Sequence, residues 1–196
     1  HLDRFAKAVN VAIFYHKRLV LSVHNTHHYA NVAEKHKPDA HERFMYVVYN
    51  SEYTRDALKY PNPSIIVHPP VNGERVKTKR GEKITLINLW EDKGGKVLQE
   101  IARLMPDKKF LGVKGGYGEQ ETCSLKNIEY IENTPDIKKV YGKTRIILMP
   151  SKYESYGRVA VEAMASGIPV IAQPTPGLKE CLGDAGIYCE RSAPEQ

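Results

Sequence analysis

Two glutamates, Glu154 and Glu162, are separated by seven residues and follow an apolar run over residues 145–151. Gly157 lies between them, where a helix is expected to begin. A helix N-terminus attracts anions, because its first amides lack partners within the helix and its dipole is positive there. A carboxylate on each side of such a site suits an anion that also carries hydroxyl groups. A nucleotide sugar is a ligand of that kind.

The elements around these glutamates alternate between strand and helix from residue 82 onward. Apolar runs predict strands at residues 84–89, 110–113, 127–131, 145–149, 169–172 and 186–189. Helices are predicted at residues 96–105, from 136, at 157–166 and near 178–182. This alternation predicts an α/β fold with a parallel sheet and helices on both faces.

The candidate chemistry follows the ends of these strands. Lys93-Gly94 comes after the first strand, the glycine-rich segment 114–118 after the second, and residues 154–157 after the fourth. Ligands of parallel sheets bind at the carboxyl ends of the strands, where these loops converge. We therefore expect the three segments to form one site.

The first 81 residues have a different character. A helix is predicted from Leu2, followed by strands at 19–23, 44–49 and 64–67, with Ser51 capping a helix that ends at Leu58. Pro, Gly, Lys and Arg dominate residues 69–81 and mark a domain boundary. The expected organisation is a partial N-terminal domain at 1–70, a linker at 71–81 and a C-terminal domain at 82–196.

Charge and cysteine content narrow the class of protein. Residues 1–80 hold 13 Lys and Arg against 7 Asp and Glu, whereas residues 81–196 hold 16 of each. The basic first part fits nucleic acid, anionic lipid or a phosphorylated acceptor, or simply a solvated surface. Three cysteines without a C-x-x-C pair argue against a disulfide framework, and no apolar run is long enough for a bilayer span. We therefore expect a cytoplasmic location, with peripheral membrane association left open.

Together these segments resemble the E-x7-E motif region of retaining glycosyltransferases with the GT-B fold, the group that includes glycogen-synthase-like, mannosyl- and glucosyltransferases. Glu154 and Glu162 match the motif itself. The other matching segments, in chain order, are 49–54, 68–72, Lys93-Gly94, 167–170 and 177–180. Each match alone is weak, but their order and spacing are specific. The resemblance implies a C-terminal Rossmann-like sheet plus the latter part of an N-terminal Rossmann-like domain.

The resemblance also assigns roles to the glutamates and the helix start. Glu154 would contact the donor sugar, and Glu162 the ribose hydroxyls. The amides around Tyr156, Gly157 and Arg158 would cradle a phosphate. The alternative is that Glu154 is a capping acid and Glu162 a solvated helix residue.

The diphosphate end departs from the family pattern. Lys93 would bind the diphosphate as a point charge and stabilise the leaving group. Relatives usually carry an arginine where this chain has Asn88, which donates hydrogen bonds but has no charge. Arg158, at a position that is commonly apolar, could replace that cation. The alternative for Arg158 is a surface salt bridge.

Three further positions follow from the resemblance. Gly115 and Gly116 would contact the nucleotide, although glycines also serve tight turns. Ile131 follows the third strand, where the family reads the base through backbone groups. His24 would face the donor sugar from the N-terminal domain, whereas His27 and His28 are expected at the surface. No metal site is expected among these histidines, because no carboxylate or cysteine is spaced to complete one.

The resemblance implies transfer of a sugar from a nucleotide-diphosphate sugar to a glycan or lipid-linked acceptor, with retention and without a metal or other cofactor. Two alternatives remain at this stage. The basic N-terminal part would suit transfer to nucleic acid bases. Asn88 and the short N-terminal part would suit a non-catalytic module that binds nucleotide sugars.

Overall fold

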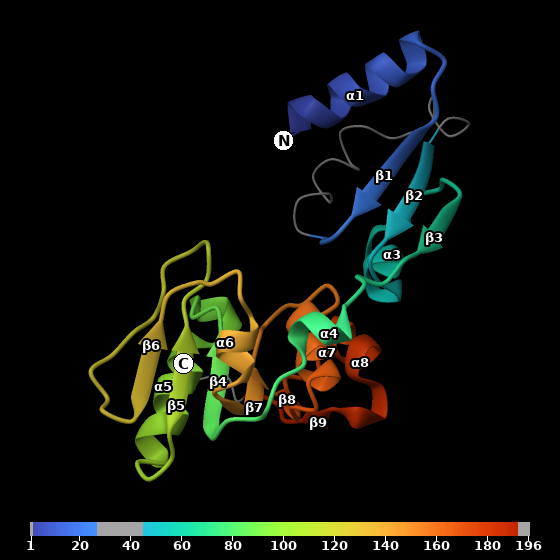
Figure 1. Cartoon of the computed structure of the whole chain (residues 1–196). Coiled ribbons are helices and arrows are strands. Elements are labelled where there is room, and N and C mark those ends of the chain that lie inside the picture. The colour runs from blue at the N-terminus through green and yellow to red at the C-terminus, as the bar shows by residue number, and fades with distance from the viewer. Residues whose placement is uncertain (1, 27–44, 192–196) are drawn as a thin grey trace. The chain divides into compact units, whose positions relative to one another are not determined.

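The chain divides into two compact units, His1–Pro69 and Pro70–Gln196 (Figure 1). The computed structural model describes residues 2–26 and 45–191, apart from the side chains of residues 2–6 and 9. Each unit is built around its own parallel sheet. Among the described helices, none combines the length and the apolar character needed to cross a bilayer.

The first unit holds a three-stranded sheet in the order β1-β2-β3. Its elements are α1 (Leu2–Phe14), β1 (Leu19–Val23), β2 (Met45–Tyr49), α3 (Glu52–Leu58) and β3 (Ser64–Ile66). Ser51 caps α3, because its side chain accepts a hydrogen bond from the Thr54 amide at 3.0 Å. This cap and the three strands confirm the sequence prediction, except that residue 44 lies outside the described range.

The second unit holds a six-stranded sheet in the order β6-β5-β4-β7-β8-β9. Its strands are β4 (Lys83–Ile87), β5 (Phe110–Val113), β6 (Ile128–Ile131), β7 (Thr144–Met149), β8 (Val170–Ala172) and β9 (Ile187–Tyr188). Its helices are α4 (Gly73–Val76), η1 (Glu91–Lys93), α5 (Gly95–Leu104), α6 (Lys138–Tyr141), α7 (Arg158–Ala165), α8 (Pro176–Leu182) and η2 (Gly183–Ala185). The predicted parallel α/β fold is confirmed, with predicted and observed boundaries after residue 82 no more than two residues apart. The three short elements α4, η1 and η2 were not predicted.

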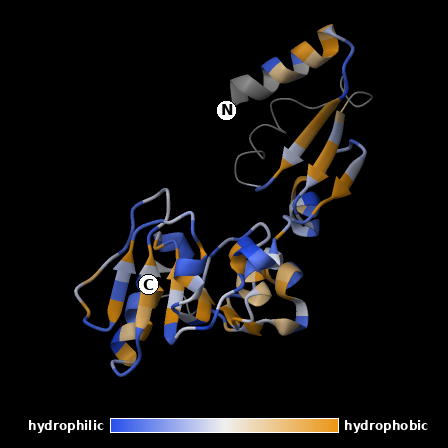
Figure 2. Ribbon diagram, viewed as in Figure 1, coloured by the Kyte–Doolittle hydropathy of each residue, from blue (hydrophilic) through white to orange (hydrophobic). Residues whose placement is uncertain are grey.

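Apolar side chains fill both faces of this sheet, and they come from its strands and from the helices and loops that cover it (Figure 2). Successive side chains of β7 point to opposite faces: Ile147 and Met149 join one core, and Leu148 joins the other. Helix α5 covers the Leu148 face, while α4, α6, α7 and α8 cover the opposite face. Burial on both faces explains why the strands read as continuous apolar runs rather than as alternating patterns.

The stretch expected as a linker, residues 71–81, carries a short helix that packs on the second unit. Asn72 caps α4 by accepting a hydrogen bond from the Arg75 amide. The side chain of Val76 is buried in the core of the second unit, and the Ser166 hydroxyl donates to the Val76 carbonyl at 2.7 Å. The buried Val76 side chain and this hydrogen bond thus attach the segment to the core and to the end of α7.

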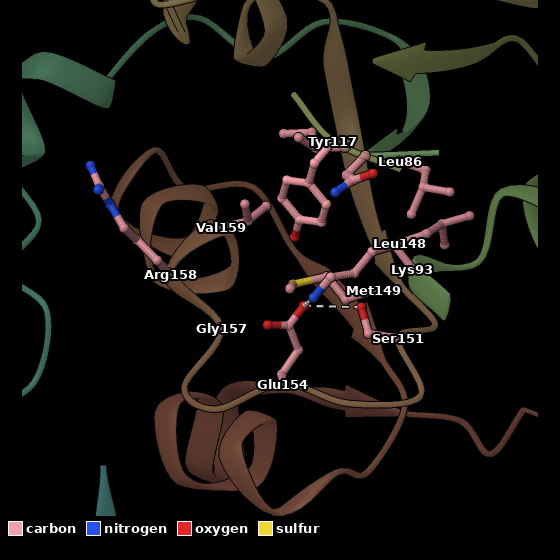
Figure 3. A pocket seen from close by; sticks show the side chains of 12 residues that line it. Leu86, Lys93, Tyr117, Leu148, Met149, Ser151, Glu154, Gly157, Arg158 and Val159 are labelled. Carbon is pink, nitrogen blue, oxygen red and sulfur yellow. Dashed lines mark hydrogen bonds and ion pairs between the residues drawn. The ribbon is translucent and has the colours of Figure 1, made fainter. Parts of the chain in front are cut away.

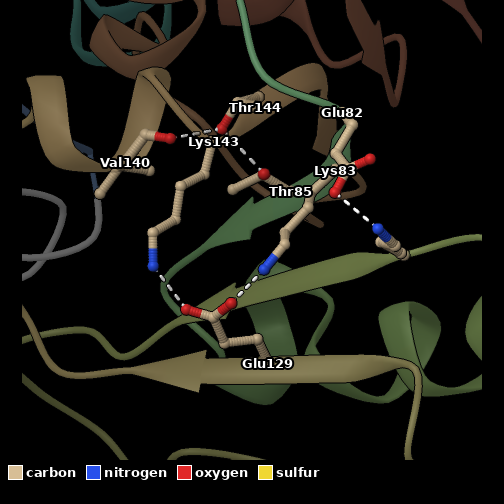
Figure 4. Close-up of polar contacts among 8 residues, drawn as sticks. Glu82, Lys83, Thr85, Glu129, Val140, Lys143 and Thr144 are labelled. Atoms are coloured by element: carbon tan, nitrogen blue, oxygen red, sulfur yellow. Dashed lines mark hydrogen bonds and ion pairs between the residues drawn. The ribbon is translucent and has the colours of Figure 1, made fainter.

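Polar side chains pair with one another at the amino-terminal edge of the sheet (Figure 4). Glu129 accepts hydrogen bonds from Lys83 and from Lys143, and these bonds hold the pKa of its carboxyl below the ordinary value. The buried Thr144 hydroxyl donates to the Val140 carbonyl at 2.8 Å and therefore accepts from Thr85 at 2.9 Å. These contacts tie β6, β4 and β7 together at that edge.

Candidate active site

A pocket of about 220 Å³ lies at the carboxyl edge of β4 and β7 (Figure 3). The two strands are parallel neighbours, so the segments that follow them meet at one edge. The lining residues are Leu86, Ile87, Asn88, Lys93, Tyr117, Leu148, Met149, Ser151, Glu154, Gly157, Arg158 and Val159. The structure thus brings together five predicted site residues, namely Asn88, Lys93, Glu154, Gly157 and Arg158.

Lys93 and Glu154 form the charged centre of the pocket. The Lys93 ammonium donates to Glu154 Oε1 at 2.6 Å and lies 3.4 Å from the Tyr153 carbonyl. The Ser151 hydroxyl donates to the same carboxylate oxygen at 3.0 Å. Both charged side chains are largely buried, at 18% and 16% exposure. Such a pair offers a cation and an acceptor within one small space, which suits a ligand with a phosphate and hydroxyl groups.

Close backbone packing brings Lys93 to the loop after β7. Gly94 has a φ of 100° and lies against Pro150, where an added Cβ would be 2.3 Å from the proline Cγ. Only glycine combines this backbone angle with so close an approach. The two residues of the predicted Lys93-Gly94 pair therefore have different roles. Gly94 allows the close contact with Pro150, and this contact places Lys93 in the pocket.

Helix α7 begins at the pocket. Gly157 is its N-cap, with a φ of 95°, and no side chain caps the first amides. Uncapped amides at a helix start attract anions, and the phosphate site expected here stays a prediction. Gly177 in α8 packs directly against the loop between β7 and α7. An added Cβ at Gly177 would lie 2.3 Å from the Glu154 carbonyl oxygen.

Glu162 lies in α7 but does not line the pocket. Its carboxylate is 11% exposed and accepts from Arg158 Nε at 2.8 Å and from the Tyr141 hydroxyl at 3.1 Å. Burial raises the pKa of Tyr141 well above its ordinary value, and the adjacent Glu162 carboxylate adds to the rise. Tyr141 therefore remains a donor. Each oxygen of Glu162 accepts one of these hydrogen bonds and has a second acceptor position, but the carboxylate is largely buried and does not line the pocket, so its role at the ribose stays a prediction.

Arg158 lines the pocket as a paired cation. Its side chain is 69% exposed, and its guanidinium extends away from Glu154 (Figure 3). The ion pair with Glu162 has the i,i+4 spacing that is favourable on a helix. The structure therefore supports the salt-bridge alternative, while the exposed part of the guanidinium stays accessible to a ligand.

The glycine-rich segment contributes through Tyr117 rather than through its glycines. Tyr117 lines the pocket and makes an edge-to-face contact with Trp90 at 5.9 Å between ring centroids. Gly115 and Gly116 do not line the pocket. The Gly115 amide instead donates to Gln120 Oε1 at 2.6 Å. Packing explains why position 115 is a glycine, because an added Cβ there would lie 2.4 Å from Asn88 Oδ1.

Two other predicted residues lie apart from the pocket. Ile131 lines a separate hollow of about 550 Å³ at the end of β6, together with Glu132, Lys138 and Lys143 among others. Tyr156 is buried and does not line the pocket, and burial raises the pKa of its hydroxyl. Its backbone is next to Gly157. The expected contact between its amide and a phosphate therefore remains compatible with this position, whereas a contact of its side chain with the ligand does not.

His24 belongs to the first unit, directly after β1. Its Nε2 lies 3.0 Å from the Ser22 hydroxyl, and its carbonyl accepts from Asn50 Nδ2 at 3.0 Å. Asn50 thereby joins the carboxyl ends of β1 and β2. The role of His24 at the sugar stays a prediction. His27 and His28 lie outside the described residues.

Sequence reasoning missed Ser151, Tyr117 and Tyr141. Ser151 stands two residues after a predicted strand, so its position at the ligand edge was a usable signal. Tyr117 was part of the glycine-rich segment but was treated only as a neighbour of its glycines. Tyr141 reaches Glu162 across 21 residues of chain, and no local pattern indicates that contact.

Cys181 lies behind Gly157 and provides a test of this packing. Burial raises the pKa of its thiol from about 9 to about 12, and the Glu154 carboxylate adds to the rise. Thiolates are the reactive species, so the raised pKa keeps Cys181 protonated and unreactive near pH 8. We expect iodoacetamide at pH 8 to modify the exposed Cys189 at least about tenfold faster than Cys181.

Peptide mass spectrometry over time measures both rates. The modification rate of Cys181 should keep rising with pH up to about 12. The difference between the rates of Cys181 and Cys189 should vanish when urea unfolds the protein. Equal rates in the folded protein would show that Cys181 is accessible and ionised, contrary to the packing described.

Comparisons with known proteins found similarity to glycosyltransferases. Residues 118–196 match the family described as Glycosyl transferases group 1. An uncharacterized glycosyltransferase of Haemophilus influenzae is 29% identical over 160 residues, which cover 73% of this chain and 44% of that protein. The O-antigen chain mannosyltransferase B of Escherichia coli is 35% identical over 65 residues, 32% of this chain and 17% of that protein.

Solved structures extend the similarity to both units. Anabaena HepE, in complex with UDP and glucose, has a TM-score of 0.79 and 18% identity, covering 97% of this chain and 62% of that chain. WaaG, a glycosyltransferase involved in lipopolysaccharide biosynthesis, has a TM-score of 0.64 and 13% identity, covering 95% and 67%. The chain thus spans less than half of the H. influenzae relative and under two thirds of HepE. Residues 118–196 are similar in sequence to group 1 glycosyltransferases, and the chain has the parallel α/β fold of GT-B glycosyltransferases.

Proposed function

We propose that this chain binds a nucleotide-diphosphate sugar and belongs to an enzyme that transfers the sugar, with retention, to a glycan or lipid-linked acceptor. The observation that carries the proposal is the Lys93–Glu154 pair, joined by Ser151, beside the start of α7. The family match from residue 118 onward and the fold shared with HepE support it.

The pocket residues divide the work by charge. The Lys93 ammonium and the amides at the start of α7 would receive the diphosphate, where negative charge develops as the sugar departs. When the Lys93 ammonium donates to a phosphate instead of to Glu154, Glu154 Oε1 can accept hydrogen bonds from the sugar hydroxyls. The donor should therefore supply both an anion and hydroxyl groups, because an anion alone would bind Lys93 and leave the largely buried Glu154 carboxylate with the neutral Ser151 hydroxyl in place of its cation.

Attack from the face of the leaving group explains retention without a separate base. The departing phosphate oxygen would take the proton of the acceptor hydroxyl as the new glycosidic bond forms. The protein then contributes positioning and electrostatic stabilisation. No general base is assigned, and no cofactor is proposed.

Binding and hydrolysis of UDP- and GDP-sugars test the proposal. We expect at least one donor to bind, and Glu154→Gln to lower its turnover by about 100-fold or more, because the sugar loses a charged acceptor. Glu119→Gln, an exposed glutamate outside the pocket, is the matched control and should change nothing. Binding without turnover by the wild-type chain would favour a non-catalytic binding module, and binding of no donor would overturn the proposal.

A further inference from the structure

One side chain, Gln120, joins the two segments that follow β4 and β5. Its Oε1 accepts from the Leu89 amide at 2.9 Å and from the Gly115 amide at 2.6 Å. Its Nε2 donates to the carbonyls of Tyr117 at 2.8 Å and Gly118 at 3.2 Å. Two donors on the oxygen and two acceptors on the nitrogen fix which way this amide faces.

Gln120 and the Trp90 amide together orient Asn88. Asn88 Oδ1 accepts from the Trp90 amide at 3.1 Å and faces Gln120 Nε2 at 3.4 Å. Both neighbours are donors, so the oxygen of Asn88 points toward them and the nitrogen points elsewhere. Within the part of the chain that the structure describes, Asn88 Nδ2 has no protein acceptor, and Asn88 lines the pocket.

Backbone geometry keeps Asn88 in this place. Its φ of 71° is left-handed, which asparagine tolerates better than most residues. Its amide group lies against Gly115, whose missing Cβ leaves the space. Asn88 therefore has little freedom other than rotation of its amide, and Gln120 Nε2 and the Trp90 amide oppose that rotation.

We propose that Gln120 is a positioning residue that holds the Asn88 amide with its N–H groups toward the diphosphate of the donor. The proposal rests on the proposed function, because it takes the anion to be a nucleotide diphosphate. In this arrangement a neutral donor replaces the cation that the family resemblance led us to expect. A rotated Asn88 would present its oxygen to the anion and repel it.

A purely structural role for Gln120 makes a different prediction. If Gln120 only holds the 114–118 segment in place, its loss acts regardless of the residue at position 88. If it acts through Asn88, its loss has no further effect once the Asn88 side chain is gone. Asn88→Gly is the suitable background, since glycine accepts the left-handed backbone without strain.

The experiment is a double-mutant cycle on binding of UDP and GDP, measured by titration calorimetry on the whole chain. Gln120→Met keeps the shape and removes all five contacts, and Gln173→Met makes the same change outside the pocket. We expect Gln120→Met and Asn88→Gly each to raise Kd about tenfold, and the double variant no more than either alone. Gln173→Met should match wild type.

A second readout follows the Asn88 side chain itself. In the ¹⁵N-labelled protein its NH₂ signals, assigned by their loss in Asn88→Gly, should shift on addition of UDP in the wild type and not in Gln120→Met. This signal does not depend on the stability of the variant, provided that Trp90 fluorescence shows it folded.

The outcomes separate the two proposals. A wild type that binds nucleotide, with Gln120→Met binding equally well or with fully additive effects, would overturn the role of Gln120 and leave the proposed function standing. Unchanged binding by Asn88→Gly would do the same. A wild type that binds no UDP, GDP or their sugars would overturn the proposed function and, with it, this inference.

Discussion

Replacement of Lys93 by alanine is expected to lower donor turnover by about 100- to 1,000-fold, the range seen when one group that stabilises developing charge is removed. The variant loses the cation nearest the pocket centre. It also leaves the largely buried Glu154 carboxylate with Ser151 as its remaining pocket partner. An uncompensated carboxylate there would repel the diphosphate, so binding should weaken along with turnover.

Two matched variants make this result specific. Lys96→Ala removes a half-exposed lysine one helical turn away, whose nearest carboxylate oxygens lie 3.7 Å away, and should leave turnover within about twofold. Lys93→Arg keeps the charge but replaces a point cation with a planar fork, so it should fall between the two. Hydrolysis rates of the preferred donor, at saturating and at limiting concentration, separate lost binding from lost turnover. Turnover by Lys93→Ala within about threefold of wild type would remove Lys93 from the mechanism.

Much of the site could be predicted from sequence because its signals are local. Each pocket-forming segment directly follows an apolar run, and in a parallel sheet that position is at the ligand edge. Lys93 and Glu154 could therefore be placed near each other although 61 positions separate them. Gly157 was readable as a helix start for the same reason.

The other contacts of the site could not be predicted, because they depend on the direction in which a side chain points, and the spacing of residues in the sequence does not determine that direction. Glu162 was correctly placed in the helix after Gly157, yet its carboxylate turns toward Arg158 and Tyr141. The i,i+4 spacing was a usable signal for the first contact, although only an unspecified salt bridge of Arg158 was predicted, whereas the second contact needs the packing of α6 on the same face of the sheet. The five contacts of Gln120 likewise reach up to 32 positions along the chain, and no periodic pattern encodes them.

The glycines show a third case, where the residue was right and its role different. Gly115 follows a strand and was expected to let the nucleotide approach the backbone. In the structure it gives that space to Asn88 instead. A glycine reports that something approaches closely, but the neighbour can be protein as readily as ligand.

Gly157→Ala is expected to lower the free energy of unfolding of the second unit by about 2–5 kcal/mol. The left-handed backbone, with a φ of 95°, costs about 1–2 kcal/mol for a residue with a Cβ. The new methyl would also lie 2.6 Å from Leu178 Cδ2 and 3.2 Å from the Cys181 sulfur, and overpacking of this kind costs about 1–3 kcal/mol. Urea denaturation followed by fluorescence of Trp90, the single tryptophan, reports on this unit alone.

Gly167→Ala separates the two contributions. Gly167 also has a left-handed backbone, with a φ of 70°, but no atom lies within 4 Å of an added Cβ. It should therefore show the backbone cost without the clash, and the difference between the variants measures the contact of Gly157 with α8. Equal destabilisation would mean that α8 yields without cost. If α8 does resist, the start of α7 must shift toward the pocket, and Gly157→Ala should weaken UDP binding at urea concentrations where both variants remain folded, whereas Gly167→Ala should not.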